Sequence, residues 1–479
     1  MAALHAHSAA ELGAAFAAGS LSPVEVLNDV LAQVQRWEPQ LCATYALDPD
    51  GAHQMARASE ARWLNGHSLG PLDGVPVTIK ENIATRGVPM PLGSAATLLA
   101  PMTEDAPPAA RLREAGAVIF SKTTMPDYGM LSSGLSSFHK LARNPWNLQK
   151  TPGGSSAGAG AAAAAGYGPL HLGTDIGGSI RLPAAWCGVV GFKPSNGRVP
   201  IKPPYIGRVA GPLTRTVQDA ALMMAVLSQP DARDATSLPP QPIDWNDLGS
   251  EPQNTLRGKK IGLLQHAGWG LPLDADIEAA VMGAARVLEQ NGAHVEWLPA
   301  FTTREMADGI NLFWRMRSFL DIKALPPERQ ALVLPYIREW VAAGSGFTAA
   351  QLFHGFSQIA ALRDAAVAAC QPFDFVISPV APVSAFDASA ASPTADPLRA
   401  MEHIAYTLPY NMSEQPALSV PCGFSAAGLP RALPIGLQII GQRFDDLGVL
   451  RLGRAYEQLR GALRPWPLPS PSPSQRPPA

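Results

Sequence analysis

Hydrophobic and polar positions near the start of the chain follow the helical period. Ser8 and Ser22 each stand three residues before a glutamate, the capping-box pattern that begins a helix, and Pro23 suits a first helical position. Apolar residues then recur at helical spacing through 24–34. We therefore expect two N-terminal helices, the first ending near Gly19, packed on the outside of the main body.

Further along, strand and helix patterns alternate. Residues 75–79 alternate apolar and polar side chains as strands do, and 260–298 read as a strand–helix–strand unit, which favours parallel pairing. The pattern predicts strands at 75–79, 117–120, 260–264, 294–298 and 437–440 and helices at 109–115, 276–289 and 445–459. This order predicts an α/β fold with a large mixed β-sheet flanked by helices on both faces.

No linker cleanly divides the chain, so we expect a single domain over 1–463. Segments 228–252 and 378–397 are rich in proline and small polar residues, which is typical of surface loops or of a rim over a site. We expect the substrate rim within about 300–400. The proline-rich segment 464–479 has few apolar anchors and is expected to be disordered.

Composition narrows the class of protein. The 479 residues are 47% hydrophobic and 16% charged with a net charge of −2, which argues against a general nucleic-acid binder or a polybasic membrane binder. No apolar run reaches the roughly 18 residues of a membrane helix. The four cysteines form no C-x-x-C pair and no zinc motif is present. We expect a soluble, cytoplasmic protein with no metal, no cofactor, and no nucleic-acid or membrane partner.

The most unusual segment, 151–194, is dense in glycine around Ser155, Ser156 and Ser179. In Gly177-Gly178-Ser179 successive backbone N–H groups could cradle an oxyanion beside a serine nucleophile. An equally acceptable interpretation is that these glycines only make tight turns. The G-x-S-x-G match at 154–158 is short enough to arise by chance, and a loose dinucleotide fingerprint at 158–163 lacks the strand that should precede it.

A serine nucleophile needs a base, and Lys80 is the candidate. It ends the apolar strand 75–79, and a buried lysine becomes a base because burial disfavours its charged form. The alternative from the local sequence alone is a lysine paired with its neighbour Glu81.

The motifs of 72–194 resemble the amidase signature family. The matching elements are GVPVTIKEN at 74–82, NPW at 144–146, PGGSS at 152–156, GTDIGGSIR at 173–181, GVVGFKP at 188–194, QPALSVP at 415–421 and PIGLQ at 434–438. The resemblance implies the fold of that family and a Ser–cisSer–Lys triad. In that triad Ser179 is the nucleophile, Ser155 the bridging serine after a cis peptide bond, and Lys80 the base.

The resemblance also implies supporting groups for a reaction through an acyl-serine intermediate. The backbone N–H groups of the oxyanion hole would belong to Ile176, Gly177, Gly178 and Ser179. Asp175 and Arg181 would brace the loop, and Ser156 would help to orient the triad.

Members of the family include stand-alone amidases, carbamate hydrolases and the glutaminase subunit of a tRNA-dependent amidotransferase. The chain departs from that subunit's pattern at 195–205 and at Asn411–Glu414. These departures favour a stand-alone amidase that hydrolyses a small amide, anilide or carbamate as a monomer or homodimer, with the small-molecule substrate as its partner. The alternatives are a non-catalytic binding scaffold and the amidotransferase subunit.

Specificity is expected in three regions. The family places Gly129–Ser132 beside the acyl site, so Met130 and Ser132 are candidate substrate contacts. The second region, within 313–320, and the third, within 336–356, are aromatic and apolar positions that either line the pocket or belong to the core. These are Phe313, Trp314, Phe319, Leu320, Tyr336, Trp340, Phe353 and Phe356.

Overall fold

One mixed β-sheet runs through the computed structural model, which describes residues 3–425 and 432–469. The strand order is β1-β3-β2-β4-β6-β5-β10-β11-β9-β7-β8. The strands are β1 Thr44–Tyr45, β2 Pro76–Lys80, β3 Val118–Thr123, β4 Leu170–Asp175, β5 Val190–Lys193, β6 Val209–Thr214, β7 Lys260–Leu263, β8 His294–Trp297, β9 Phe375–Pro379, β10 Ala417–Phe424 and β11 Pro434–Gly441.

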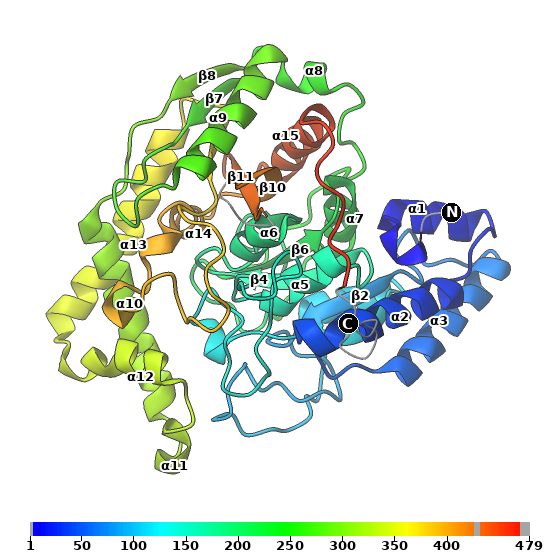
Figure 1. Cartoon of the computed structure of the whole chain (residues 1–479), viewed down its shortest axis with the longest axis horizontal. Helices are drawn as coiled ribbons and strands as arrows, with labels where there is room; N and C mark the ends of the chain where they lie inside the picture. Colours follow the sequence, from blue (N-terminus) through cyan, green and yellow to red (C-terminus); the bar gives the residue numbers. More distant parts are fainter. Residues whose placement is uncertain (1–2, 426–431, 470–479) are drawn as a thin grey trace, which may run out of the picture.

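Helices cover the sheet and extend beyond both of its ends (Figure 1). The α-helices are α1 Ala9–Ala17, α2 Pro23–Leu41, α3 Pro49–Leu64, α4 Pro107–Glu114, α5 Ala157–Ala165, α6 Arg181–Cys187, α7 Val217–Leu227, α8 Pro252–Leu256, α9 Ala275–Gln290, α10 Arg304–Lys323, α11 Pro327–Gln330, α12 Pro335–Ala342, α13 Ala349–Cys370, α14 Leu408–Met412 and α15 Asp446–Leu459. Short 3-10 helices are η1 Leu4–Ala6, η2 Asp127–Gly129, η3 Ala343–Gly346, η4 Pro397–Arg399 and η5 Glu402–Ile404. Within these described ranges no helix is long and apolar enough to cross a membrane.

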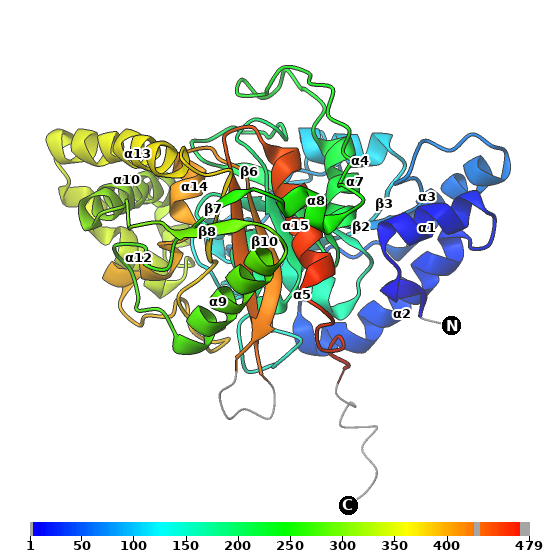
Figure 2. The ribbon, with the colours of Figure 1, turned by 90° about the horizontal axis from the view of Figure 1, so that it is seen from above.

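The pairing confirms the predicted mixed sheet with helices on both faces. β2 pairs in parallel with β3 and β4, and β7 pairs in parallel with β8 and β9. The middle strands β6, β5, β10 and β11 pair antiparallel. The unit β7–α9–β8 is the expected parallel crossover. Figures 1 and 2 place α1–α3 at one end of the molecule and α10, α12 and α13 at the other.

The two N-terminal helices form as their capping residues predict. The Ser8 and Ser22 side chains accept from backbone N–H groups, and in each case the glutamate three residues on closes the capping box. α2 buries one face against the main body, and its C-terminal residue is followed by Cys42 in the left-handed conformation. The local sequence therefore sets both ends of this region.

Strand β2 differs from its alternating pattern because all five of its residues are buried. It lies between β3 and β4 in a helix-covered sheet, where both faces of a strand are shielded from water. Thr78 and Lys80 are therefore enclosed despite being polar.

Helix α5 is almost entirely alanine and glycine, and every residue in it is buried. Small side chains let it approach the neighbouring backbone closely. A Cβ atom on Gly158 would lie 2.1 Å from the Ala43 carbonyl oxygen. This tight packing holds the N-terminal end of α5, which Ser155 and Ser156 precede, against Ala43 before β1 and Thr124 after β3.

The two predicted loops and the first residues of the predicted tail can be located in the structure. Residues 228–251 contain neither helix nor strand. The loop after β9 reaches the pocket described below through Ala391 and Ser392. At the start of the tail, Trp466 lies beneath the Arg215 guanidinium, with 4.7 Å from its carbon to the ring centroid. The rest of the predicted disordered tail, 470–479, lies outside the described residues.

Candidate active site

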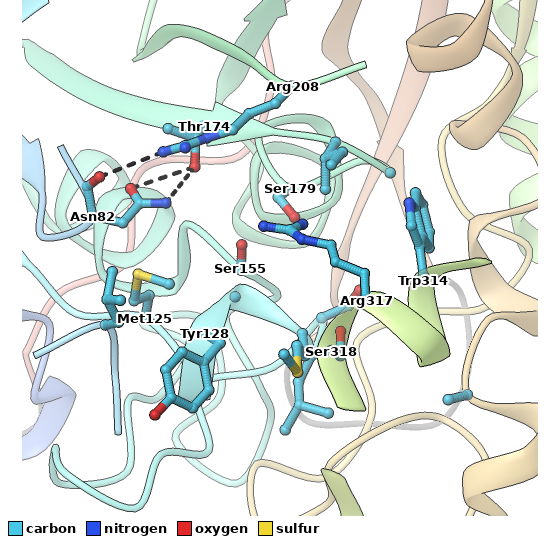
Figure 3. A pocket seen from close by; sticks show the side chains of 18 of the residues that line it. Asn82, Met125, Tyr128, Ser155, Thr174, Ser179, Arg208, Trp314, Arg317 and Ser318 are labelled. Atoms are coloured by element: carbon cyan, nitrogen blue, oxygen red, sulfur yellow. Dashed lines mark hydrogen bonds between the residues drawn. The ribbon is translucent and has the colours of Figure 1, made fainter. Parts of the chain in front are cut away.

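Lys80 ends β2 with its side-chain nitrogen among three hydroxyl groups. Its Nζ lies within hydrogen-bonding distance of all three, at 2.8 Å from Ser155 Oγ, 3.0 Å from Thr174 Oγ1 and 3.1 Å from Ser156 Oγ. Thr174 comes from β4, the neighbour of β2, and also accepts from Asn82 Nδ2 at 3.1 Å. The sheet thus brings residues distant in sequence into one hydrogen-bonded cluster, part of which is visible in Figure 3.

The environment of Lys80 favours a neutral amine. Burial is the largest cause that holds the pKa of Lys80 well below its usual range, and the positive charge of Arg208 adds to it. Asp175 and Glu81 act in the opposite direction. Glu81 forms its ion pair with His139, at 2.8 Å between Oε2 and Nε2. The described contacts of Lys80 are therefore with hydroxyls, and the Lys80–Glu81 pair considered from the sequence does not form.

The carboxylate of Asp175 organises the loop that carries Ser179. Its Oδ1 accepts from the Gly178 N–H at 2.8 Å and its Oδ2 from the Ile180 N–H at 3.0 Å. Arg181 Nη2 donates to Oδ1 at 2.9 Å. Burial alone would raise the pKa of Asp175, but the ion pair with Arg181 holds this pKa well below its usual range. Asp175 and Arg181 therefore lie together at the loop for which the resemblance implies a bracing role.

The predicted oxyanion cradle needs one correction. The Gly178 N–H already donates to Asp175 Oδ1 and is not available to a substrate. Among the described residues, no acceptor takes the N–H groups of Ile176, Gly177 and Ser179. Three of the four predicted donors therefore remain.

Ser155 and Ser179 line the same pocket without a direct hydrogen bond between their hydroxyls among the described contacts (Figure 3). The peptide bond between Gly154 and Ser155 is cis, as the family resemblance implied. Ser156 Oγ accepts from Lys80 and donates to the Thr174 carbonyl oxygen at 3.1 Å, which fits its predicted orienting position. Catalytic hydrogen bonds are often long before substrate binds, so the Ser155–Ser179 contact can tighten later.

The serines open into a pocket of about 530 Å³. Met130 and Ser132 line it, in agreement with their predicted location. Of the eight aromatic and apolar candidates, Trp314 and Trp340 line it. The remaining six do not contribute to the described lining: Phe313, Phe319, Leu320, Tyr336, Phe353 and Phe356. Their amphipathic helices expose some of them instead, and Phe353 is 76% exposed.

Two arginines, one aspartate and one histidine of the pocket escaped the sequence analysis: Arg208, Arg317, Asp321 and His403. Burial lowers the pKa of His403 to about 4, and neither of its ring nitrogens has a partner among the described residues. None of the four belongs to a local motif, so no sequence signal marks them. Thr174 and Asn82, by contrast, lie inside the quoted motifs and could have been noticed there.

The described residues hold no group of three or more His, Cys, Asp or Glu side chains that could bind a metal ion. The chemistry that this arrangement can support is nucleophilic. An amine whose pKa is lowered contacts the Ser155 hydroxyl, the Ser179 hydroxyl lies in the same pocket, and the N–H groups of Ile176, Gly177 and Ser179 have no acceptor among the described residues.

Known proteins that are similar to this chain belong to the family that the motifs resemble. A family model described as Amidase matches residues 25–450. A solved bacterial aryl acylamidase of the amidase signature enzymes family superposes with a TM-score of 0.85 at 30% identity, covering 95% of this chain and 96% of its own. The peptide amidase from Stenotrophomonas maltophilia superposes with a TM-score of 0.82 at 26% identity, covering 97% and 99%.

Curated proteins similar in sequence are named as amidotransferase subunits, whereas the solved structures above are named as amidases. A glutamyl-tRNA(Gln) amidotransferase subunit of Myxococcus xanthus is 37% identical and covers 94% of this chain and 96% of its own length. The protein of the same name from Chloroflexus aurantiacus is 35% identical and covers 95% and 97%.

These relatives overturn two expectations from the sequence. The prediction of a stand-alone amidase for small amides, anilides or carbamates is wrong, and so is the prediction of a monomer or homodimer with only a small-molecule partner and no nucleic acid. Both rested on departures at 195–205 and Asn411–Glu414. Those departures are local, whereas the similarity to proteins named as a subunit of a tRNA-dependent enzyme extends along nearly the whole chain.

Proposed function

The chain belongs to the amidase family, and on that premise we propose that it is the glutaminase-type subunit of a glutamyl-tRNA(Gln) amidotransferase. In this function it releases ammonia from the side-chain amide of glutamine. The ammonia then amidates glutamyl-tRNA(Gln) in an assembly with further subunits. The observation that carries the proposal is the 37% identity to such a subunit over 94% of this chain.

The triad geometry supports the chemical step. In the proposed mechanism the neutral Lys80 amine, 2.8 Å from Ser155 Oγ, takes the proton of that hydroxyl while Ser155 takes the proton of Ser179. Ser179 Oγ bonds to the amide carbon, and the carbonyl electron pair becomes an oxyanion. The N–H groups of Ile176, Gly177 and Ser179 stabilise that charge, and removal of one donor from such a site typically costs about 2.7–4 kcal/mol.

Collapse of the tetrahedral intermediate breaks the C–N bond. The proton held by Lys80 returns through Ser155 to the departing nitrogen, so ammonia leaves as a neutral molecule and Ser179 keeps the acyl group. A water molecule then attacks the acyl-serine, loses its proton along the same path, and releases glutamate. Lys80 and both serines end in their starting protonation states.

Ammonia release from L-glutamine tests the proposal. The full chain is assayed alone and together with its candidate partner subunits, with ammonia quantified by ion chromatography. Ser179→Ala is the matched variant, because it removes one oxygen atom and is expected to keep the circular dichroism spectrum of the wild type. Ammonia from the wild type and none from Ser179→Ala is expected. If the assembly cleaves anilides but releases no ammonia from glutamine, the proposal is wrong.

A further inference from the structure

We propose that Arg208 and Arg317 form a carboxylate-binding subsite in the active-site pocket, so that the amide substrate carries a carboxylate at the end away from the reacting amide. The inference rests on the proposed function and deepens it. Both residues line the pocket that Ser155 and Ser179 open into.

Arg208 precedes β6 and has only neutral partners. Its Nη1 donates to the Pro203 carbonyl oxygen at 3.2 Å and its Nη2 to the Asn82 carbonyl oxygen at 3.4 Å. Among the described residues it forms no ion pair. An arginine that lines a pocket without a carboxylate leaves guanidinium N–H groups for an anion.

Arg317 reaches the same pocket from α10. Its guanidinium carbon lies 3.9 Å from the centroid of the Tyr205 ring, a cation–π contact that positions the group. Its Nε lies 3.6 Å from Asp321 Oδ2, a loose pair with both side chains about half exposed. Figure 3 shows Arg317 extending toward the side of the pocket where Ser155 and Ser179 lie.

The two guanidinium groups act on each other. Burial lowers the pKa of Arg208 to about 10, and the positive charge of Arg317 contributes to that shift. Arg208 is still charged at neutral pH, so two cations face the pocket. The Asp175 carboxylate at the pocket wall is already paired with Arg181, and Asp321 offers one loosely held negative charge. The pocket therefore carries positive charge that the described side chains do not neutralise.

A carboxylate suits this arrangement better than a neutral group does. The planar fork of a guanidinium matches carboxylate geometry, and hydrogen bonds between charged partners are about twice as strong as neutral ones. The remaining wall is partly apolar, with Met90, Leu92 and Met125, which fits a methylene chain between the carboxylate and the amide. Asp321, one turn along α10 from Arg317, is placed to receive an ammonium group on the same substrate.

Arg317 is the residue to change in a test. Arg208 also lowers the pKa of Lys80, so its replacement alters the proposed base as well as the subsite. Arg317 does not contribute to the Lys80 shift. Lys323→Gln is the matched control, because it removes a positive charge from the same helix at an exposed position outside the described pocket lining.

The first measurement compares two primary amides of equal chain length, glutaramate, which carries a carboxylate, and pentanamide, which does not. We expect the wild type to prefer glutaramate by roughly 10- to 100-fold in kcat/KM. In Arg317→Gln, kcat/KM should fall for glutaramate and stay unchanged for pentanamide, so that most of the preference is lost. Lys323→Gln should keep the preference. An equal loss for both amides, or no preference in the wild type, overturns the subsite.

A second measurement separates this inference from the proposed function. Glutarate binding is followed by isothermal titration calorimetry, which needs no turnover. Binding by the wild type and Lys323→Gln that weakens at least about tenfold in Arg317→Gln supports the subsite even if glutamine is not hydrolysed. Binding that is absent, or equal in all three proteins, overturns the subsite even if ammonia is released from glutamine.

Discussion

Glu81 pairs with His139 at 2.8 Å between Oε2 and Nε2, whereas its neighbour Lys80 contacts the Ser155, Ser156 and Thr174 hydroxyls. Lys80 is the last residue of β2 and Glu81 begins the turn that follows it, so the two adjacent side chains have different partners. Glu81 is fully buried, and its second carboxylate oxygen has no partner among the described residues. Its charge still acts on Lys80 through the interior, where it partly offsets the effect of Arg208.

Replacing Lys80 should abolish turnover without unfolding the protein. In Lys80→Met the apolar side chain fills the buried space but cannot accept a proton. A positioned general base typically contributes 10²–10⁴-fold, so we expect kcat for the amide substrate to fall by at least about 10³-fold. Ammonia release and thermal unfolding are measured together. A Lys80→Met variant that retains a tenth of the wild-type rate would remove Lys80 from the role of base.

The pH dependence of kcat/KM should follow the charges around Lys80. The reaction needs the neutral amine, so activity is present above the pKa of Lys80 and is lost as the pH falls through it. Arg208→Gln removes a cation that lowers this pKa and should move the acid limb to higher pH. Glu81→Gln removes an anion that raises it and should move the limb to lower pH. Each shift is expected to be about half to one pH unit.

Pentanamide is the substrate for this profile, because it lacks a carboxylate and so keeps the proposed Arg208–Arg317 subsite out of the measurement. The two variants serve as controls for each other, since a general loss of structure would move both limbs in the same direction. Limbs that move together, or that stay at the wild-type position, contradict the assignment of the acid limb to Lys80.

The buried pair of Asp175 and Arg181 should be essential for stability. Asp175→Asn leaves the Arg181 guanidinium without its counter-charge inside the protein, where both side chains are fully enclosed. We expect a loss of about 3–5 kcal/mol in the free energy of unfolding, measured by urea denaturation. Glu296→Gln breaks the exposed pair with Lys260 and should leave the midpoint essentially unchanged. Similar midpoints for both variants would show that the buried pair is dispensable.

Two glycine substitutions in helices should have opposite signs. In Gly158→Ala the new methyl group would lie 2.1 Å from the Ala43 carbonyl oxygen and 2.5 Å from the Thr124 nitrogen, so backbone must shift. We expect a loss of about 1–3 kcal/mol or more. Gly283→Ala, in α9 with no atom within 4 Å of the new Cβ, should gain about 0.5–1 kcal/mol. Urea denaturation measures both, and a stable Gly158→Ala would contradict the tight α5 contact.

Buried His171 should make the protein sensitive to acid. Burial lowers the pKa of His171 to about 3, while the unfolded chain takes up the proton near pH 6.5. The lowered pKa of His171 stabilises the fold fully above about pH 6.5. This stabilisation is lost as the pH falls toward 3, and at pH 5 the loss is roughly 2 kcal/mol. When the pH falls from 7 to 5, the free energy of unfolding should therefore drop by roughly 2 kcal/mol less in His171→Gln than in the wild type.

The control for this comparison is His67→Gln, which removes an exposed histidine and should keep the wild-type pH dependence. Denaturation midpoints at pH 7 and pH 5 give the result. A His171→Gln protein that loses as much stability as the wild type over this interval would mean that His171 is not the acid-sensitive group.

Much of the fold could be predicted because its signals are local. Capping boxes at Ser8 and Ser22 placed two helices, and short apolar runs bounded by glycine placed β7, α9 and β8. The Lys80, Ser155 and Ser179 motifs were likewise readable in short stretches of sequence. The preference for a stand-alone enzyme failed because it weighed two local departures against similarity that only a whole-chain comparison measures.

The sequence by itself determined the class of fold and marked Lys80, Ser155 and Ser179, since both depend on patterns and motifs within short segments. Only the tertiary structure decided that Lys80 is fully enclosed, that the Gly178 N–H is consumed by Asp175, and that Arg208 and Arg317 share a pocket. The burial of a residue and the charges near it depend on groups from many segments of the chain. No local pattern encodes this dependence, because the segments become neighbours only when the sheet and its helices pack.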